Sequence, residues 1–389
     1  MPCIKMYNNK VYKCFHETNQ HFFDMTENAP TTKISALPDE ILHQIFSNLD
    51  AREIITVVVD VCTRWKYIVE TDLLFWNNLQ VVIDCDRFLD WSFFGQPFLH
   101  HHKDPVGIYV GEKDLTKVSK ARCIKLEGGS RSGGIPSQMI LYIFRKIKNV
   151  CRDIIKVECS NCFGATSKGF INLLNDSYNI SELKFGVTAV WRIPYEDISK
   201  FQSLTTLITN DYGFKRTDLS LIANGCDKLE SLWILFSRAI KNDDIICFLE
   251  SKKETIKELG IGFSVTDISL AKIKECQKLN VLFISDARCI SVEGVKCLTD
   301  LPNLKYISLH RLKIFPEHLK DWVLSSTIPK QLTLLDLSDY YFLEPLQIHH
   351  IITKTCPVTY NNDVREAIAQ SYKKPVKPWI HWMYRNVFS

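Results

Sequence analysis

The chain has 389 residues, of which 46% are hydrophobic and 24% charged, and its formal net charge at pH 7 is +4. This length is too great for one typical hydrophobic core, so we expect several domains or a repeat array. The small net charge gives no case for nucleic acid or an anionic membrane as partner, and no stretch approaches the roughly 20 apolar residues that cross a bilayer.

Residues 1–33 are polar and irregular and end in Ala29-Pro30-Thr31-Thr32, which predicts a flexible leader. Lys5, Lys10 and Lys13 interrupt its apolar residues, so it has no signal-peptide core. The 14 cysteines are scattered singly through the chain, a pattern typical of reduced thiols. We therefore expect a cytoplasmic and/or nuclear protein.

Residues 34–80 are predicted to be helical. Ser35 is a candidate N-cap, and Pro38 suits the first helical turn, where a missing N–H costs nothing. Apolar residues then recur at helical spacing at Ile41, Leu42, Ile45, Phe46 and Leu49. This pattern predicts an amphipathic helix with one apolar face.

Two further helices are expected before residue 80. The second carries the apolar run 54–59, but its β-branched residues Val57, Val58 and Val59 lower helix propensity and leave its length open. The third holds Trp65, Ile68 and Val69, followed by Leu73, Leu74 and Trp76.

From about residue 80 a unit of the form apolar-x-x-apolar-x-apolar recurs with a period of about 25 residues, which is typical of leucine-rich repeats. An early copy is Ala121, Ile124 and Leu126, and 81–83 is a candidate start of the array. Thr209 is the one anchor that is not apolar. The middle anchors of the eight successive units are Val157, Leu183, Leu207, Leu232, Leu259, Leu282, Ile307 and Leu335.

Each unit continues into a turn and a short helical pattern, as at 168–174 and 292–298. Because one unit cannot bury its apolar face alone, stacked neighbours must share a continuous core. The sequence thus predicts an α/β solenoid over 81–360, with parallel inner strands and outer helices. Cys226 and Cys276 each precede a first anchor by three residues, as small buried residues at helix ends would.

Two segments do not follow the period. The stretch of about 88–118, which includes His100-His101-His102, fits no repeat and is predicted to be an irregular insertion. Residues 361–389 form a tail rich in Lys, Pro and aromatic residues. The tail could cap the open end of the solenoid or act as a partner-binding arm.

The helical segment carries a specific set of motifs: Leu37-Pro38-x-Glu40-Ile41-Leu42, Ile45-Phe46-x-x-Leu49, Val61-Cys62-x-x-Trp65 and Leu74-x-Trp76-x-x-Leu79. This segment resembles an F-box, and the units behind it look like the cysteine-containing class of leucine-rich repeat. Together they resemble the F-box/leucine-rich-repeat family. The resemblance implies a small all-helical F-box domain followed by a horseshoe-shaped solenoid.

The resemblance also implies a function. Such a protein is the substrate-recognition subunit of a Skp–cullin–F-box ubiquitin ligase, joined through a Skp-type adaptor to a cullin–RING ligase. Its repeats hold a protein substrate, unidentified here, for ubiquitination and proteasomal degradation. The adaptor contacts carried over to this chain are Leu37, Pro38, Ile41, Leu42, Ile45 and Phe46. The alternative for this apolar face is the core of a small helical domain.

In such a subunit the chemistry occurs on other proteins, so no catalytic residues and no cofactor are expected. The sequence shows no Ser/His/Asp set, paired carboxylates or Cys/His pair that stands out as catalytic. Cys159 and Cys162 lack the second pair that a zinc site needs, and 128–134 lacks the Lys-Ser/Thr ending of a P-loop. A non-catalytic repeat scaffold that binds proteins outside ubiquitination remains the alternative function.

Strand alternation places the residues that flank the anchors on the concave side of the solenoid. We hypothesise that Gly260 opens an apolar slot between Trp233 and Phe283 into which a substrate side chain enters. In the alternative, these aromatic rings pack on each other or lie under the tail. The predicted substrate-binding residues are Ile208, Trp233, Leu235, Gly260, Phe283 and Tyr306.

Overall fold

The computed structural model describes residues 34–85, 88, 107–128, 137–160, 167–174, 179–186, 193–211, 213–234, 237, 239–314, 318, 332, 334–336 and 358–359. The chain divides into two compact units between Asp50 and Ala51. Several predictions fall outside the described residues: the leader 1–33, His100-His101-His102, Cys162, residues 129–134, Leu235 and the tail 361–389.

The described part of the first unit contains η1 (Ile34–Ala36) and helix α2 (Asp39–Phe46). Ser35 lies within η1, so the predicted N-cap is wrong, and Pro38 holds the N-cap position of α2 instead. The carbonyl of Pro38 accepts the amide of Leu42 at 3.1 Å, so proline begins the helix without losing a hydrogen bond.

The second unit starts with five helical segments, one of which is a π-helix. A π-helix, η2 (Ile54–Val58), separates α3 (Ala51–Glu53) from α4 (Val59–Val61). The break falls on the β-branched run whose low helix propensity left this helix uncertain. Helices α5 (Thr63–Thr71) and α6 (Leu73–Asn78) follow.

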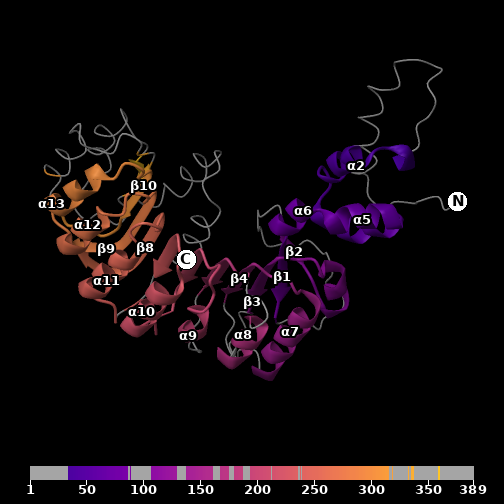
Figure 1. Ribbon diagram of the computed structural model, residues 1–389, viewed down its shortest axis with the longest axis horizontal. Coiled ribbons are helices and arrows are strands. Elements are labelled where there is room, and N and C mark those ends of the chain that lie inside the picture. The colour runs from indigo at the N-terminus through magenta and orange to yellow at the C-terminus, as the bar shows by residue number, and fades with distance from the viewer. Residues whose placement is uncertain are drawn as a thin grey trace, which may run out of the picture. The chain divides into compact units, whose positions relative to one another are not determined.

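The rest of the described chain is a parallel sheet with helices on its outer side (Figure 1). Its strands are β1 (Gln80–Asp84), β2 (Gly107–Tyr109), β3 (Cys123–Glu127), β4 (Lys156–Ser160), β5 (Glu182–Phe185), β6 (Thr206–Thr209), β7 (Ser231–Ile234), β8 (Glu258–Thr266), β9 (Val281–Cys289), β10 (Tyr306–Leu309), β11 (Leu334–Asp336) and β12 (Val358–Thr359).

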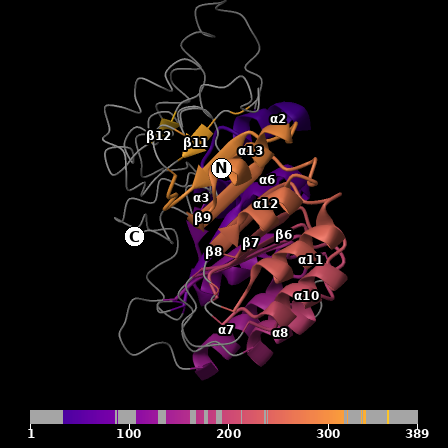
Figure 2. The same ribbon diagram turned by 90° about the vertical axis from the view of Figure 1, so that its left-hand side faces the viewer.

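Each strand from β3 to β9 leads to a helix that crosses the outer side of the sheet, and neighbouring helices lie beside one another (Figure 2). Before them, η3 (Glu112–Val118) lies between β2 and β3. The helices that follow β3 to β9 are α7 (Ser137–Val150), α8 (Ser167–Leu174), α9 (Tyr195–Ile198), α10 (Arg216–Gly225), α11 (Asn242–Lys252), α12 (Asp267–Ile273) and α13 (Val292–Lys296), and η4 (Cys297–Asp300) continues from α13.

The predicted middle anchors stand opposite one another across the sheet. The pairing runs from Val157 through Leu183, and onward to Ile307 and Leu335, without a register shift at any anchor. The middle anchors from Val157 to Ile307 are at most 2% exposed, because each covers its neighbour. The predicted solenoid of parallel strands and outer helices is therefore confirmed.

The predicted irregular insertion is wrong in its second half. Residues 107–118 contain β2 and η3, and β2 pairs in parallel with β1 at the end of the sheet. The chain returns to the edge of β1 before it continues to β3, so β1 lies between β2 and β3. The alternation of Val106, Ile108 and Val110 between Pro105 and Gly111 was a strand signal, but it is too short to show the repeat pattern.

Thr209, the one polar anchor, has a partner. The hydroxyl of Tyr195 on α9 lies 2.7 Å from the Thr209 hydroxyl, and both residues are buried. The same threonine oxygen accepts the amide of Asp211 at 3.2 Å. Burial, followed by the nearby charge of Asp211, raises the pKa of Tyr195 well above its usual value, so the phenol stays protonated and can donate.

The cysteines at helix ends are buried as predicted. Burial raises the pKa of Cys226 and of Cys276 to about 12, which keeps both thiols uncharged at neutral pH. Cys151 holds the same position before Ile154, and burial raises its pKa to about 12 as well. These thiols therefore act as small packing residues of the array.

Candidate functional site

The inner face of the sheet is charged over its first strands. Lys125 lies 2.7 Å from Glu127 and 3.5 Å from Glu158, and these three residues form a first ion-pair group. Asp84 stands beside Glu127 in the strand register. All four side chains come from positions that alternate with the buried anchors, so strand geometry directs them to the side of the sheet opposite the helices.

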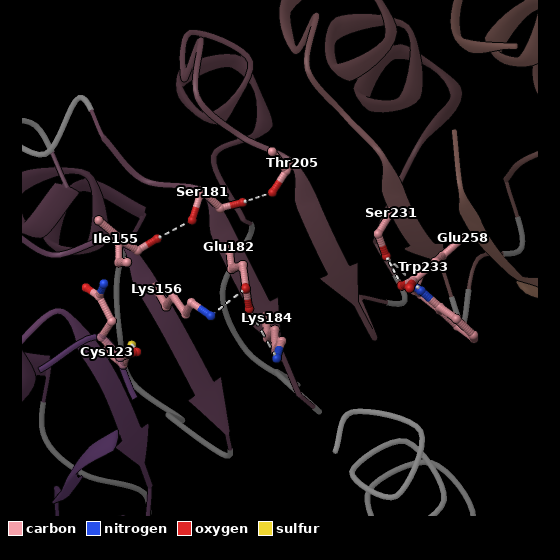
Figure 3. Close-up of polar contacts among 11 residues, drawn as sticks. Cys123, Ile155, Lys156, Ser181, Glu182, Lys184, Thr205, Ser231, Trp233 and Glu258 are labelled. Atoms are coloured by element: carbon pink, nitrogen blue, oxygen red, sulfur yellow. Dashed lines mark hydrogen bonds and ion pairs between the residues drawn. The ribbon is translucent and has the colours of Figure 1, made fainter. Parts of the chain in front are cut away.

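A second ion-pair group lies on β4 and β5 (Figure 3). Glu182 is 2.8 Å from the ammonium of Lys156 and 3.5 Å from that of Lys184. The Lys156 side chain is 41% exposed, and those of Glu182 and Lys184 are 24% and 20% exposed. The tips of these side chains are therefore accessible to a partner.

One residue of each group has a pKa shifted toward its charged form by the ion pairs. Burial by itself would raise the pKa of Glu182, but Lys184 and Lys156 outweigh it and lower that pKa. Burial would likewise lower the pKa of Lys125, and Glu158 and Glu127 reverse that effect and raise it. Glu182 and Lys125 are thus ionised near neutral pH.

Further along the sheet the inner face is closed, and its largest side chains are aromatic. Trp233 is 1% exposed, and its ring centroid lies 5.7 Å from that of Phe283, which is 2% exposed. The indole N–H donates to the Ser231 hydroxyl at 3.2 Å, and that hydroxyl is 2.8 Å from Glu258, so the ring is held at its polar end (Figure 3). Ile208 is also buried, at 1% exposure.

The predicted open slot at Gly260 is therefore wrong. A Cβ placed on Gly260 would lie 1.9 Å from the six-membered ring of Trp233, because that ring already occupies the space above the glycine. Gly260 is required for this close approach. The packing of the two aromatic residues on each other was the alternative expectation. Whether this face, with half-buried Tyr306, contacts a substrate stays a prediction.

The part of the chain that the structure describes has neither a metal-binding cluster nor a membrane-spanning helix. Within that part of the chain, no group of three or more His, Cys, Asp or Glu side chains is arranged to hold a metal ion. None of its helices is long and apolar enough to span a membrane.

The predicted adaptor contacts on α2 and just before it fall into two sets, which differ in exposure. Pro38 is exposed and Ile41 is 39% exposed, while Leu37 and Ile45 are half-buried. Leu42 and Phe46 are 0% and 5% exposed and face the interior. Helical periodicity places these two residues, at positions i and i+4, on the packed side, and their contact with an adaptor stays a prediction.

A second set of exposed apolar residues lies between residues 57 and 74. Val57 and Val61 are each 42% exposed, Tyr67 on α5 is 67% exposed, and Leu73 and Leu74 at the start of α6 are 65% and 73% exposed. The helix that carries the two leucines is well anchored. Its N-cap Asp72 accepts the amide of Phe75 at 2.9 Å.

The anchoring of α6 continues toward the sheet. The buried indole N–H of Trp76 donates to the Val69 carbonyl at 2.8 Å. The Asn77 side chain accepts the Arg122 guanidinium at 2.7 Å, and the Asn77 carbonyl accepts the Cys123 thiol at 3.0 Å. Leu73 and Leu74 thus project from a helix fixed by hydrogen bonds on its other sides.

Large exposed apolar side chains are concentrated at this end of the sequence. Over the described residues there are nine, and six of them lie between residues 34 and 80. The other three are Tyr142, Leu221 and Ile268, spread over 127 positions of the repeat array. Apolar residues gathered at a surface mark an interaction site, whereas scattered ones are ordinary.

Residues 34–80 match the model of the F-box-like family. These residues are an F-box-like domain. The resemblance predicted from the Leu37–Leu42 and Leu74–Leu79 motifs is therefore confirmed for this segment.

Two solved structures match parts of this chain. The yeast Rad7–Elc1 complex matches with a TM-score of 0.46 and 14% identity, over 92% of this chain and 95% of that one. An internalin from Listeria monocytogenes matches with a TM-score of 0.38 and 12% identity, over 66% of this chain and 72% of that one.

The F-box-like domain exposes residues that the sequence analysis did not assign to a surface. Leu73 and Leu74 were placed among the apolar residues of a predicted helix, without a distinction between its faces. Adjacent apolar residues give no signal of exposure, because the neighbours Ile68 and Val69 on α5 are both buried. For Leu73 and Leu74, as for Val61 and Tyr67, only the packing of the neighbouring helices decides the exposure.

Proposed function

We propose that this protein is the substrate-recognition subunit of a Skp–cullin–F-box ubiquitin ligase. Its F-box-like domain docks on a Skp-type adaptor, and its repeat array holds the protein substrate. The observation that carries the proposal is the concentration of exposed apolar residues in the F-box-like domain, six of the nine over the described residues.

The energetics of such a joint are reasonable. Burial of one Leu, Ile or Val side chain contributes about 1.5–3 kcal/mol, and association costs about 4–15 kcal/mol in lost freedom. One or two exposed residues could not offset that cost, but the exposed set of the second unit, which includes Val57, Val61 and the two leucines of α6, can. The proposed contacts on α2 and in the two residues before it are Leu37, Pro38, Ile41 and Ile45.

The test measures adaptor binding by the full-length chain. We expect the double substitution Leu73→Ala with Leu74→Ala, and separately Pro38→Ala with Ile41→Ala, to weaken binding of a purified Skp-type adaptor at least tenfold by calorimetry. The matched control, Leu221→Ala with Ile268→Ala, removes two exposed apolar residues from the array and should bind like the unmodified chain. Unchanged adaptor affinity in both domain variants would refute the proposal.

Ubiquitin transfer separates the ligase from a scaffold that acts outside ubiquitination. The chain is reconstituted with the adaptor, a cullin–RING ligase and a conjugating enzyme, together with a protein captured by the repeat array. A ligase subunit places ubiquitin on the captured protein, and this transfer should disappear in the Leu73→Ala, Leu74→Ala variant. Adaptor binding without transfer would favour the scaffold.

A further inference from the structure

Asn77, near the end of α6, is hydrogen-bonded to residues at the start of β3. Its side-chain oxygen accepts the Arg122 guanidinium at 2.7 Å, and its backbone carbonyl accepts the Cys123 thiol at 3.0 Å. Cys123 is buried, and burial raises the pKa of its thiol, so the sulfur keeps the proton that it donates. These two hydrogen bonds, which we call the α6 link, connect the helix that carries Leu73 and Leu74 to the array.

The covalent connection between α6 and the sheet is short. Helix α6 ends at Asn78 and β1 begins at Gln80, so Leu79 alone lies between them. Leu79 is fully buried, and its amide donates to the Phe75 carbonyl at 2.8 Å. A buried side chain and a bonded amide leave this connection little freedom to rotate. Helix α6 accordingly belongs to the same compact unit as the array.

Arg122 occupies a backbone position that recurs in the array. Its carbonyl accepts the amides of Ile155 and Lys156 at 2.8 and 3.1 Å. One repeat later, the Ile155 carbonyl accepts the amides of Ser181 and Glu182 at the same two distances. The residue immediately before each of these strands therefore holds the beginning of the next strand through two hydrogen bonds.

Side chains at this recurring position reach back to the preceding repeat. The Ser181 hydroxyl donates to the Ile155 carbonyl at 3.3 Å, and the Thr205 hydroxyl donates to the Ser181 carbonyl at 3.0 Å (Figure 3). The Arg122 side chain reaches Asn77 from the same position. Arg122 thus attaches α6 to the array with the side chain that elsewhere attaches one repeat to the one before it.

We infer that Asn77 and Arg122 are positioning residues, which hold the exposed leucines of α6 at a fixed orientation to the repeat array. This rests on the proposed function, in which an adaptor docks on α6 and the array holds a protein substrate. The α6 link then sets where the substrate lies relative to the adaptor. Neither Asn77 nor Arg122 needs to contact the adaptor or the substrate for this role.

A small rotation at the α6 link displaces the far strands considerably. Seven strand spacings separate β3 from β10 in the sheet order, which is about 34 Å along the sheet at about 4.8 Å per spacing. A rotation of about 10° would therefore move β10 by up to about 6 Å. A protein held on the array would then present different lysines to the conjugating enzyme from one moment to the next, which lowers both the rate and the selectivity of transfer.

The experiment compares Asn77→Ala and Arg122→Ala with the unmodified full-length chain in the reconstituted transfer reaction. Both residues are half-buried, and both variants keep Leu73 and Leu74. Adaptor affinity by calorimetry should therefore stay within about twofold of the unmodified value. We expect ubiquitin transfer to slow about fivefold and to reach more lysines of the captured protein by mass spectrometry. Asn77→Asp keeps an acceptor for the guanidinium and should restore the rate and the lysine pattern.

A distance measurement tests the α6 link without any partner. Dyes are attached through unnatural amino acids at two exposed positions, Thr63 on α5 and Asn224 on α10, and single-molecule energy transfer gives their distance distribution. The distribution should broaden in Asn77→Ala and in Arg122→Ala, and it should narrow again in Asn77→Asp. A substitution that only lowers the free energy of unfolding leaves the folded molecules with the original distribution.

The matched control removes a similar hydrogen bond far from α6. The Asn303 side chain donates to the Gln277 carbonyl at 2.8 Å between two later repeats, and Asn303→Ala should change neither the transfer nor the distance distribution. Transfer at the unmodified rate in both α6-link variants, or a distance distribution no broader than that of the control, would overturn the inference. If the unmodified chain binds no adaptor, the ligase assignment fails, and the distance distributions still decide whether Asn77 and Arg122 fix α6 to the array.

Discussion

The F-box-like domain and the repeat array differ in how far their apolar residues are exposed. The array places them in rows that cross the sheet, and each middle anchor from Val157 to Ile307 is covered by the next repeat. The F-box-like domain spans far fewer residues and leaves Ile41, Leu73 and Leu74 at its surface. Stacked repeats bury one another's apolar residues, whereas the F-box-like domain retains apolar surface that a second protein can bury.

The largest expected effect separates a leucine of the array from a leucine of the domain. Leu232→Ala should reduce the free energy of unfolding by about 3 kcal/mol, because a fully buried side chain leaves a cavity. Leu74→Ala should change it by less than about 0.5 kcal/mol, since that side chain is 73% exposed. Urea denaturation of both variants checks the comparison, and equal losses would show that the two regions do not differ.

Gly260→Ala measures how closely the array is packed. Its Cβ would meet the Trp233 ring at 1.9 Å, so we expect a loss of about 2 kcal/mol in the free energy of unfolding. The matched double variant combines Gly260→Ala with Trp233→Leu, which removes the obstructing ring. The loss in the double variant should be smaller than the sum of the two single losses. Additive losses in urea denaturation would contradict the proposed contact.

Tyr195→Phe removes the hydroxyl that faces the polar anchor Thr209. Loss of a buried hydrogen bond at 2.7 Å should reduce the free energy of unfolding by about 1 kcal/mol. Thr209→Val also removes the acceptor of the Asp211 amide, so the loss in the Tyr195→Phe, Thr209→Val double variant should be smaller than the sum of the two single losses. Urea denaturation of the three variants provides the measurement, and strictly additive losses would argue against the pairing.

The smallest expected effect concerns the ion pairs of the inner face. The pKa of Glu182 is lowered in the folded state, so its contribution is present above the ordinary value of 4.5 and is lost as the pH falls through the lowered pKa. Glu182→Gln should therefore cost less than about 1 kcal/mol near pH 7 and less still near pH 3. Unfolding free energies at both pH values test this. A cost that grows on acidification would have the wrong sign.

Much of the array could be predicted from the chain because its information is local and periodic. The spacing around anchors such as Leu183 and Leu282 predicts the strand, its buried face and its register together, because the same spacing recurs in every repeat. Strand β2 was not predicted, because a three-residue strand outside the repeat pattern carries little periodic signal. Its pairing with β1 depends on the path that the chain takes between them.

The candidate surfaces were only partly predictable. The motif from Leu37 to Phe46 identified the F-box-like segment, but it could not separate exposed Ile41 from buried Leu42, its direct neighbour. Strand alternation correctly placed Trp233 and Gly260 on adjacent strands in register. It could not show that the tryptophan ring turns across the glycine and fills the expected slot.

The sequence by itself determined that an F-box-like segment precedes a parallel repeat array, because helical and strand periodicities are written in the spacing of apolar residues. Only the tertiary structure decided which side chains remain available to a partner. Exposure depends on what neighbouring helices and strands cover, and charge on the inner face depends on which lysine meets which glutamate across the strands. Those arrangements leave Leu73, Leu74 and Lys156 accessible and close the space above Gly260.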